Sequence, residues 1–227
     1  MGWWDSERGG SDDSDGESDF ERQRDELIEQ LRGRERVSDR ALAALAAVPR
    51  HEFVPENKRR YAYADRPLPI GEGQTISAPH MVAIMVDRLE LEAGQTVLEI
   101  GTGCGYHAAV TAEIVGAANV YSVEYHSSLA ERARSRLAEL GYGDISITVG
   151  DGHEGWPEHA PYDRAYLTAA ASSVPDALLE QLRPDGIFLG PIGDRRQTLV
   201  RVRKRPDGET ERETFGGVRF VRMQGGR

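Results

Sequence analysis

The chain has a single cysteine, Cys104, among its 227 residues. An intrachain disulfide is therefore impossible, and a zinc site built from several cysteines is excluded. The six histidines are scattered, with no H-x-H or H-x-x-x-H pair, so the sequence indicates no metal site. No apolar run approaches the ~20 residues that span a bilayer, and the N-terminus lacks the basic start and apolar stretch of a signal peptide. We therefore expect a soluble, cytoplasmic protein with no membrane partner.

Lysine is also scarce, since Lys58 and Lys204 are the only ones, and acids outnumber basic residues 38 to 28. Much of the net charge of -10 lies in residues 1–20, where seven acids accompany one arginine. The remainder is mildly acidic and has no basic stripe, whereas binding to a nucleic-acid backbone needs clustered Lys and Arg. We expect no nucleic-acid partner. Because residues 1–20 are rich in Ser, Gly and Asp, we expect them to form a disordered acidic tail.

Strand and helix patterns alternate through most of the chain. Strands are expected at 96–100, 119–123, 145–149, 163–168 and 186–190, and helices at 107–115, 127–140 and 174–182. This alternation predicts a parallel sheet covered on both faces. Two further strand patterns, at 197–203 and 218–223, flank a turn signal at 206–208 and predict an antiparallel pair. The expected fold is α/β, Rossmann-like and doubly wound, with a mostly parallel seven-stranded sheet and an antiparallel C-terminal pair.

The N-terminal part has a different pattern and is expected to form a helical appendage rather than a second domain. The protein is expected to be a monomer. Apolar residues at i, i+4 spacing predict a helix over 21–31, and Ser38 is a typical N-cap for a helix over 39–48. Prolines and glycines over 67–73 predict an irregular loop. A helix over 79–89 follows, with proline in its first turn and one apolar face.

A glycine-rich turn follows the first strand of the alternating region. Gly101, Gly103 and Gly105 come after a buried strand and before a helix, so that backbone can approach a ligand closely and the helix N-terminus can face it. A dinucleotide fingerprint would need a third glycine where Tyr106 stands. With Glu99 two positions before the first glycine, the turn instead resembles the S-adenosylmethionine loop of class I methyltransferases. That resemblance implies that Glu99 faces the methionine portion of the cofactor.

Two further acidic positions follow the next two strands. Glu124 ends the second strand, about 20 residues past the glycines, where a carboxylate can accept hydrogen bonds from both ribose hydroxyls. Asp151 and Gly152 follow the third strand, where the resemblance implies a contact near adenine. Either acid alone is compatible with a solvated strand end. Together with the glycine loop, which includes Thr102, they are interpreted as cofactor-binding residues.

The wider sequence resembles the protein-L-isoaspartate O-methyltransferases from about Ser38 to Gly226. The segments that carry this resemblance are 48–55, 73–81, the glycine loop, 150–152, 168–171 and 218–221. The stretch G-Q-T-I-S-x-P at 73–79 is specific to this family among methyltransferases. Residues 21–78 are then a helical and loop extension, and residues 79–227 form the methyltransferase core. The family implies S-adenosyl-L-methionine as cofactor, S-adenosyl-L-homocysteine as product, and isoaspartyl-containing proteins and peptides as partners.

The chemistry of that reaction suits these residues. An isoaspartyl carboxylate has an unperturbed pKa of roughly 3.3–3.9 and is ionised at neutral pH, so it can attack a sulfonium methyl without a strong general base. The protein then has to position the carboxylate and remove water from it. By resemblance, Ser77 is the active-site hydroxyl near the transferred methyl group. Substrate-binding residues are expected in three segments: Thr75, Ile76 and Ser77; Thr168 and Ala169; and Val218 and Phe220. In the family the methyl ester then collapses to a succinimide, which starts repair.

Other interpretations stay open for several of these residues. Ser77 could be an ordinary helix cap, and Cys104 a reactive thiol or only a small loop residue. Three histidines could act as bases or lie at a polar rim: His80, His107 and His153. The segment 167–171 lacks the Asn/Asp-Pro-Pro-aromatic pattern of methyltransferases that act on amines of nucleic acids. The remaining alternatives are a paralogue that binds S-adenosylmethionine without repairing anything, and a methyltransferase for another carboxylate.

Two positions depart from the family pattern. Arg222 stands where the family commonly has proline, and His107 stands where Asn is frequent, so either could alter substrate choice. The excess of acids with few lysines is similar to proteins of salt-loving archaea, although a GC-rich genome would also favour arginine codons.

Overall fold

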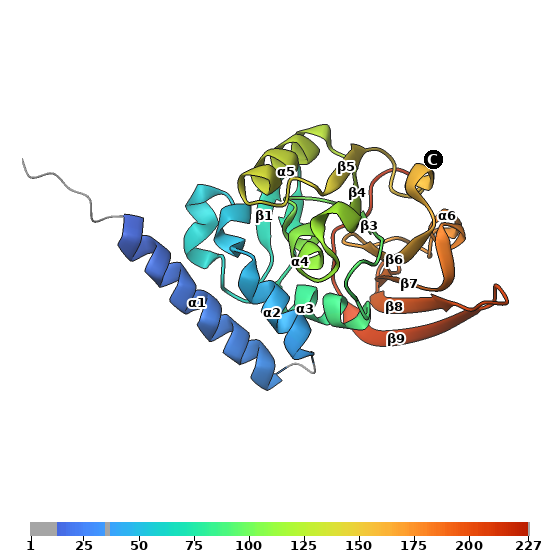
Figure 1. Ribbon diagram of the computed structural model, residues 1–227, viewed down its shortest axis with the longest axis horizontal. Helices are drawn as coiled ribbons and strands as arrows, with labels where there is room; N and C mark the ends of the chain where they lie inside the picture. Colours follow the sequence, from blue (N-terminus) through green and yellow to red (C-terminus); the bar gives the residue numbers. More distant parts are fainter. Residues whose placement is uncertain (1–12, 35–36, 227) are drawn as a thin grey trace, which may run out of the picture.

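The computed structural model describes residues 13–34 and 37–226 (Figure 1). The larger sheet contains β3 (Val97–Ile100), β4 (Val120–Glu124), β5 (Ser146–Val149), β6 (Tyr162–Leu167), β7 (Leu182–Ile192), β8 (Gln197–Lys204) and β9 (Thr210–Val218). The smaller sheet contains β1 (Leu68–Gly71) and β2 (Gln74–Ile76). The α-helices are α1 (Asp13–Arg34), α2 (Asp39–Ala47), α3 (Pro79–Arg88), α4 (Tyr106–Val115), α5 (Ser127–Glu139) and α6 (Asp176–Glu180). Short 3-10 helices are η1 (Arg50–Phe53), η2 (Glu56–Tyr61), η3 (Ala117–Asn119) and η4 (Pro157–His159).

The larger sheet has the predicted mixed topology. Its strand order is β5-β4-β3-β6-β7-β8-β9, and every neighbouring pair from β5 to β7 is parallel. The pairs β7-β8 and β8-β9 are antiparallel. Strand order reverses at β3, which lies between β4 and β6, and ligands of open α/β sheets bind beyond the carboxyl ends of the strands at such a point. The prediction of a mostly parallel seven-stranded sheet is confirmed.

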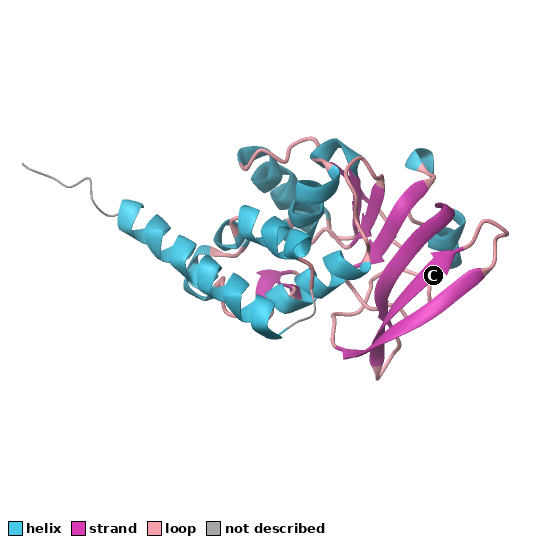
Figure 2. Ribbon diagram, turned by 60° about the horizontal axis from the view of Figure 1, so that its bottom comes forward, coloured by secondary structure: helices cyan, strands magenta, loops and turns pink. Residues whose placement is uncertain are grey.

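Apolar side chains cover both faces of this sheet, so its strands are fully buried at the centre. Figure 2 shows the strands as one twisted layer with helices on both sides. Residues of β3 alternate between the two hydrophobic clusters: Val97 belongs to the cluster shared with α2, α3 and α4, and Leu98 and Ile100 to the cluster that includes Leu178 of α6. Glu99 therefore shares the face of Val97 and lies beneath α4.

Helix α1 begins earlier than the sequence suggested. Residues 13–20 are helical rather than part of a disordered tail, while residues 1–12 lie outside the described residues. The carboxylate of Asp19 accepts hydrogen bonds from Arg22 and Gln23, one turn further along the helix. Phe20 anchors this part of the helix, because its ring stacks on His51 with centroids 4.2 Å apart. Figure 1 shows α1 along the outer edge of the molecule, beside α2.

Two other expectations were wrong in detail. The segment 67–73 forms β1 and the turn into β2 instead of an irregular loop, with Leu68 paired to Ile76. The last strand is β9, which lies upstream of the expected strand at 218–223. It is a polar edge strand that pairs with β8, with contacts such as the ion pair between Arg201 and Glu213. Its alternating charges gave no apolar strand signal.

The segment after β9 leaves the sheet edge and returns to the carboxyl ends of the strands. The backbone N–H of Ala170 donates to Val221 O at 2.8 Å, and Met223 N–H donates to Ala170 O at 2.9 Å. Gln197 also bonds both backbone polar groups of Phe220 through its side chain. We refer to residues 221–224 as the C-terminal strap.

Apart from the start of α1, the helical predictions hold within a few residues. The hydroxyl of Ser38 accepts from Ala41 N–H and caps α2, as expected, whereas α6 is shorter than the predicted helix over 174–182. None of the helices in the described ranges is long and apolar enough to cross a membrane. In those same ranges no group of three or more His, Cys, Asp or Glu side chains could hold a metal ion.

Candidate active site

A cavity opens where β3, β4 and β6 end, between the glycine loop, the β2-α3 connection and the C-terminal strap. It encloses about 750 Å³ of empty space, its open mouth included. The cavity brings together ten of the expected site residues: Thr75, Ile76, Ser77, Gly101, Thr102, Gly103, Glu124, Gly152, Thr168 and Ala169. Five others do not line it: Glu99, Gly105, Asp151, Val218 and Phe220.

The glycine loop needs glycine for steric reasons. Gly101 has a φ of 97°, and a Cβ atom there would lie 2.3 Å from the hydroxyl oxygen of Thr168. That hydroxyl is fixed, because it donates to Gly101 O at 2.5 Å. Gly105, with a φ of 90°, is the N-cap of α4. The backbone of the loop is thus exposed to the cavity without side chains in between, which allows a ligand to approach closely.

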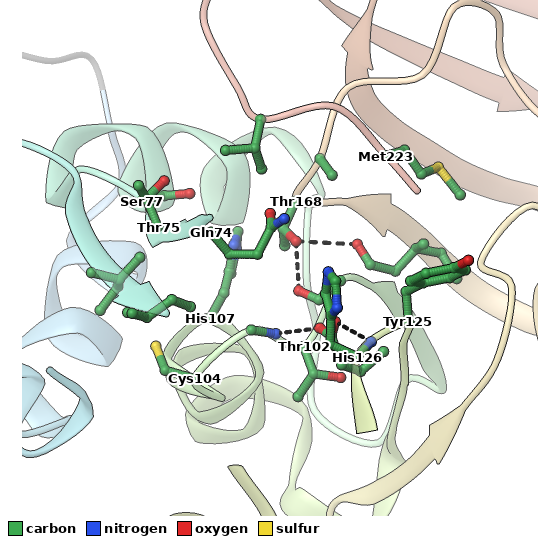
Figure 3. Close-up of a pocket in the computed structure, with 18 of the residues that line it drawn as sticks. Gln74, Thr75, Ser77, Thr102, Cys104, His107, Tyr125, His126, Thr168 and Met223 are labelled. Carbon is green, nitrogen blue, oxygen red and sulfur yellow. Dashed lines mark hydrogen bonds between the residues drawn. The ribbon is translucent and has the colours of Figure 1, made fainter. Parts of the chain in front are cut away.

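Glu124 directs its carboxylate toward the glycine loop. One oxygen accepts from Gly103 N–H at 2.8 Å and the other accepts from His126 N–H at 3.0 Å, as the dashed lines in Figure 3 show. The side chain is 4% exposed and lines the cavity. Each carboxylate oxygen keeps further lone pairs, so Glu124 can accept hydrogen bonds from a vicinal diol as well.

Glu99 lies under the loop rather than beside the cavity. It is 0% exposed, and its oxygens accept from Ser122 at 2.5 Å and from Tyr166 at 2.8 Å. Burial raises the pKa of Glu99 to about 8, against the opposing effect of these two hydrogen bonds. Ser122 in turn lies 2.6 Å from the hydroxyl of Thr102, which lines the cavity. The structure therefore links Glu99 to the cavity indirectly, through Ser122 and Thr102 on one side and through Tyr166, which packs on the cavity residue His107, on the other.

Of the neighbouring residues Asp151 and Gly152, only Gly152 lines the cavity. The carboxylate of Asp151 accepts from His153 and from Gly226 N–H, and it faces the chain end instead of the cavity. Burial opposes its ionisation, but these hydrogen bonds outweigh burial and lower the pKa of Asp151. Gly152 lines the cavity, and a Cβ atom there would lie 2.2 Å from Ile100 Cγ2. This position thus contributes a flat backbone surface to the site.

Ser77 stands in the connection from β2 to α3. Its carbonyl oxygen accepts from the buried guanidinium of Arg50 at 2.7 Å, which fixes the backbone at this point. Ser77 is not the helix cap, since the N-cap is Ala78 and Asp65 accepts from His80 N–H in the first turn. Among the described residues the Ser77 hydroxyl has no hydrogen-bond partner, so it is available to a ligand in the cavity.

The C-terminal strap supplies cavity residues that the sequence did not indicate. Val221, Arg222, Met223 and Gln224 line the cavity in place of the expected Val218 and Phe220. The resemblance indicated the segment next to the one that lines the cavity. An extended segment outside a sheet has no periodic pattern that reveals which of its residues face inward. Gln74, Tyr125 and His126 were also missed, although each lies within two residues of a predicted site residue.

The histidines and the cysteine occupy different environments. His80 and His153 are partly exposed and contact Asp65 and Asp151. His107 is only 6% exposed, so the interpretation of this histidine as a rim residue was wrong. Burial lowers the pKa of His107 to about 3 and raises the pKa of the Cys104 thiol to about 11. Cys104 is therefore protonated at neutral pH and is no activated nucleophile.

Comparison with known proteins gives a consistent result. The family model for protein-L-isoaspartate(D-aspartate) O-methyltransferase matches residues 22–227. The chain belongs to this family. Its relatives include protein-L-isoaspartate O-methyltransferase 2 of Archaeoglobus fulgidus, 52% identical over 208 residues that cover 91% of this chain and 95% of the relative. The protein-L-isoaspartate O-methyltransferase of Methanopyrus kandleri is 50% identical over 210 residues, covering 91% and 93%.

Solved structures of the protein-L-isoaspartate O-methyltransferase family share the fold. One superposes with a TM-score of 0.82 at 33% identity, covering 89% of this chain and 66% of the other. A putative member from Plasmodium falciparum, in complex with S-adenosyl-L-homocysteine, has a TM-score of 0.77 at 25% identity and covers 88% of this chain and 97% of its own. The predictions of family and fold are confirmed.

The protein-L-isoaspartate O-methyltransferase family uses S-adenosyl-L-methionine, and the cavity fits this cofactor. The fit rests on three observations: a glycine turn that lines the cavity and in which a Cβ atom at Gly101 would clash with Thr168, a buried carboxylate at the end of β4, and the flat surface at Gly152. These features suit, respectively, the methionine portion, the ribose diol and the adenine ring.

Proposed function

We propose that the chain methylates the free carboxylate of isoaspartyl residues in damaged proteins and peptides, with S-adenosyl-L-methionine as methyl donor. One observation carries the proposal: the unpartnered hydroxyl of Ser77 shares a cavity with the glycine loop and with Glu124. The relatives that bear this activity in their names are about half identical to the chain over nearly its whole length. The methyl ester is expected to start repair by way of a succinimide.

The two ends of the cavity have different tasks in this proposal. Glu124 accepts the ribose hydroxyls, and the backbone at Gly101 and Gly103 lies against the methionine portion. When bound, S-adenosyl-L-methionine supplies an electrophilic methyl group on a sulfonium. The Ser77 hydroxyl and the neighbouring Thr75 hydroxyl hold the acceptor carboxylate in line with that methyl group.

The reaction step needs orientation more than acid-base chemistry. A carboxylate oxygen forms a bond to the methyl carbon while the bond from that carbon to sulfur breaks, and the bonding electron pair stays on sulfur. No proton moves, because the attacking group is already ionised at neutral pH. The protein's residues therefore bind, align and exclude water, and the C-terminal strap with Val221 and Met223 contributes apolar surface to the cavity.

The substrate class, a cytoplasmic location and a monomeric state are predictions that belong to the same proposal. The test of the reaction is transfer of labelled methyl from S-adenosyl-L-methionine to an isoaspartyl peptide and to the matched aspartyl peptide, at low and at molar salt. We expect base-labile label on the isoaspartyl peptide alone. Cofactor binding without label on either peptide at any salt would favour a non-repair paralogue or another carboxylate substrate.

Variants of the two ends should separate binding from transfer. We expect Ser77→Ala to lower kcat/KM for the isoaspartyl peptide at least about tenfold while the Kd of S-adenosyl-L-homocysteine changes little, because the hydroxyl positions only the acceptor. Glu124→Ala should have the reverse pattern, a large increase in that Kd. Ser135→Ala, an exposed serine of α5 outside the cavity, is the matched control. A wild-type rate in Ser77→Ala would contradict the role of the hydroxyl.

A further inference from the structure

His107 is a buried histidine to which no described residue forms a hydrogen bond. It is the second residue of α4, is 6% exposed and lines the cavity. Among the described residues neither of its ring nitrogens has a hydrogen-bond partner. Its ring packs against Tyr166, with centroids 4.6 Å apart at an interplanar angle of 39°. Unpaired buried polar atoms are uncommon in folded proteins, so these two nitrogens require an explanation.

Neither Tyr166 nor Thr111 forms a hydrogen bond with His107 in the described part of the chain. A neutral imidazole offers one N–H donor and one acceptor nitrogen, and leaving a buried polar group unpaired costs about 1–3 kcal/mol. The hydroxyl of Tyr166 donates to Glu99 at 2.8 Å and lies 3.1 Å from the hydroxyl of Thr111. Both neighbours are therefore already engaged. The cavity is the side from which a partner can reach His107.

His107 belongs to the acceptor end of the cavity. Figure 3 shows its ring rising from α4 toward Ser77 and Gln74, whereas Tyr125 and Met223 lie at the opposite end. The carboxylate of Glu124 lies between the glycine loop and the end of β4, where it accepts from Gly103 N–H and His126 N–H. His107 and Ser77 both line the cavity, so one ligand group can meet both side chains.

We propose that His107 is a substrate-binding residue, an inference that rests on the proposed function. Its imidazole N–H donates a hydrogen bond to the acceptor carboxylate, and the Ser77 hydroxyl donates a second one. A carboxylate offers about four lone-pair sites, enough for both donors. No group transfers a proton in this arrangement. The imidazole orients the anion while the free carboxylate oxygen attacks.

The neutral state of this imidazole suits the reaction. Burial lowers the pKa of His107 to about 3, so the ring carries no charge at neutral pH. The negative charge of the acceptor is lost as its oxygen bonds to the methyl carbon. A cationic donor would bind the ground-state anion more tightly than the transition state, whereas a neutral donor makes that difference smaller.

The test compares two substitutions of His107 that differ in hydrogen-bonding capacity. His107→Phe keeps a planar ring and removes the donor, and His107→Asn keeps an N–H donor in a smaller side chain. We expect His107→Phe to raise the KM for the isoaspartyl peptide about tenfold or more, the size of a lost hydrogen bond to a charged group. His107→Asn should recover most of this loss. In both variants the Kd of S-adenosyl-L-homocysteine should stay within about twofold of wild type, since the donor meets only the acceptor.

Controls separate this inference from the proposed function. His159→Phe changes an exposed histidine outside the cavity and should leave both constants unchanged. Peptide binding to each variant saturated with S-adenosyl-L-homocysteine, measured by calorimetry, reports binding without turnover. If wild type methylates the isoaspartyl peptide and His107→Phe has the same KM, the inference about His107 alone is overturned. Equal losses of peptide and cofactor affinity would also overturn it, and a wild-type protein that methylates neither peptide would overturn both proposals.

Discussion

Glu99→Gln is expected to remove a pH dependence of stability that the buried carboxyl creates. In the folded protein the pKa of Glu99 is raised from 4.5 to about 8 by burial. Between these values the native state holds a proton that the unfolded chain has released. The free energy of unfolding therefore falls as pH rises through this window, by up to about 1.4 kcal/mol per pH unit and about 5 kcal/mol over the whole window. The stabilisation is fully present below pH 4.5 and is lost as pH approaches 8.

Glutamine reproduces the protonated form of this side chain. Its amide oxygen can accept from Tyr166, as Glu99 does at 2.8 Å, and its amide N–H can donate to Ser122. The hydroxyl of Ser122 then turns to donate to Thr102, 2.6 Å away. The substitution thus keeps every hydrogen bond of the buried network while removing the titratable proton.

The assay is urea unfolding of wild type and variant at several pH values from about 5 to about 8. We expect the stability of Glu99→Gln relative to wild type to increase with pH by roughly 1 kcal/mol per unit. Glu131→Gln, an exposed glutamate on α5, controls for the general effect of removing a carboxylate. A difference between Glu99→Gln and wild type that is constant across this range would refute the reasoning, because it would mean that Glu99 has the same pKa in both states.

Two further substitutions test the glycine loop and the first helix. Gly101→Ala should weaken binding of S-adenosyl-L-homocysteine about tenfold or more, because the new methyl group would lie 2.3 Å from the Thr168 hydroxyl at a φ of 97°. Calorimetry measures this, and the double variant with Thr168→Ala should recover part of the loss; wild-type affinity in Gly101→Ala would contradict the steric argument. Phe20→Ala should lower the free energy of unfolding by about 1–2 kcal/mol through loss of its stacking on His51. An unchanged urea midpoint would show that this contact contributes nothing, and turnover per folded molecule should stay at the wild-type level.

The sheet could be predicted because its strands are marked by local signals. The apolar run of β3 ends at Ile100 directly before the glycines, β4 ends at Glu124, and β5 ends two residues before Asp151. The edge was harder to predict, since β9 alternates charged residues that pair across to β8, for example Glu213 with Arg201. An apolar pattern at 218–223 misled the prediction because those residues pack at the carboxyl ends of the strands instead of within the sheet.

Which way a side chain faces was the main property that the sequence did not reveal. In a strand covered on both faces, apolar residues occur on either side, so no alternation shows that Glu99 lies under α4 and Ile100 on the other face. His107 has the same difficulty, because the first turns of α4 are buried all round. Ser77 could be predicted because it is part of the family motif. That it does not cap α3 could not be predicted, because the carboxylate that accepts from His80 N–H in the first turn belongs to Asp65, 15 residues earlier in the sequence.

The distribution of charge in the cavity fits a reaction in which two opposite charges disappear. Among the described residues that line it, only Glu124 and Arg222 belong to the acidic and basic types, while Ser77, Thr75 and a neutral His107 surround the acceptor end. A fixed charge there would stabilise one of the two reacting ions more than the transition state, in which both charges are partly lost. Neutral donors can orient the carboxylate with less of this cost. In the proposed reaction Glu124 binds the ribose of the cofactor, so its carboxylate does not meet the reacting atoms.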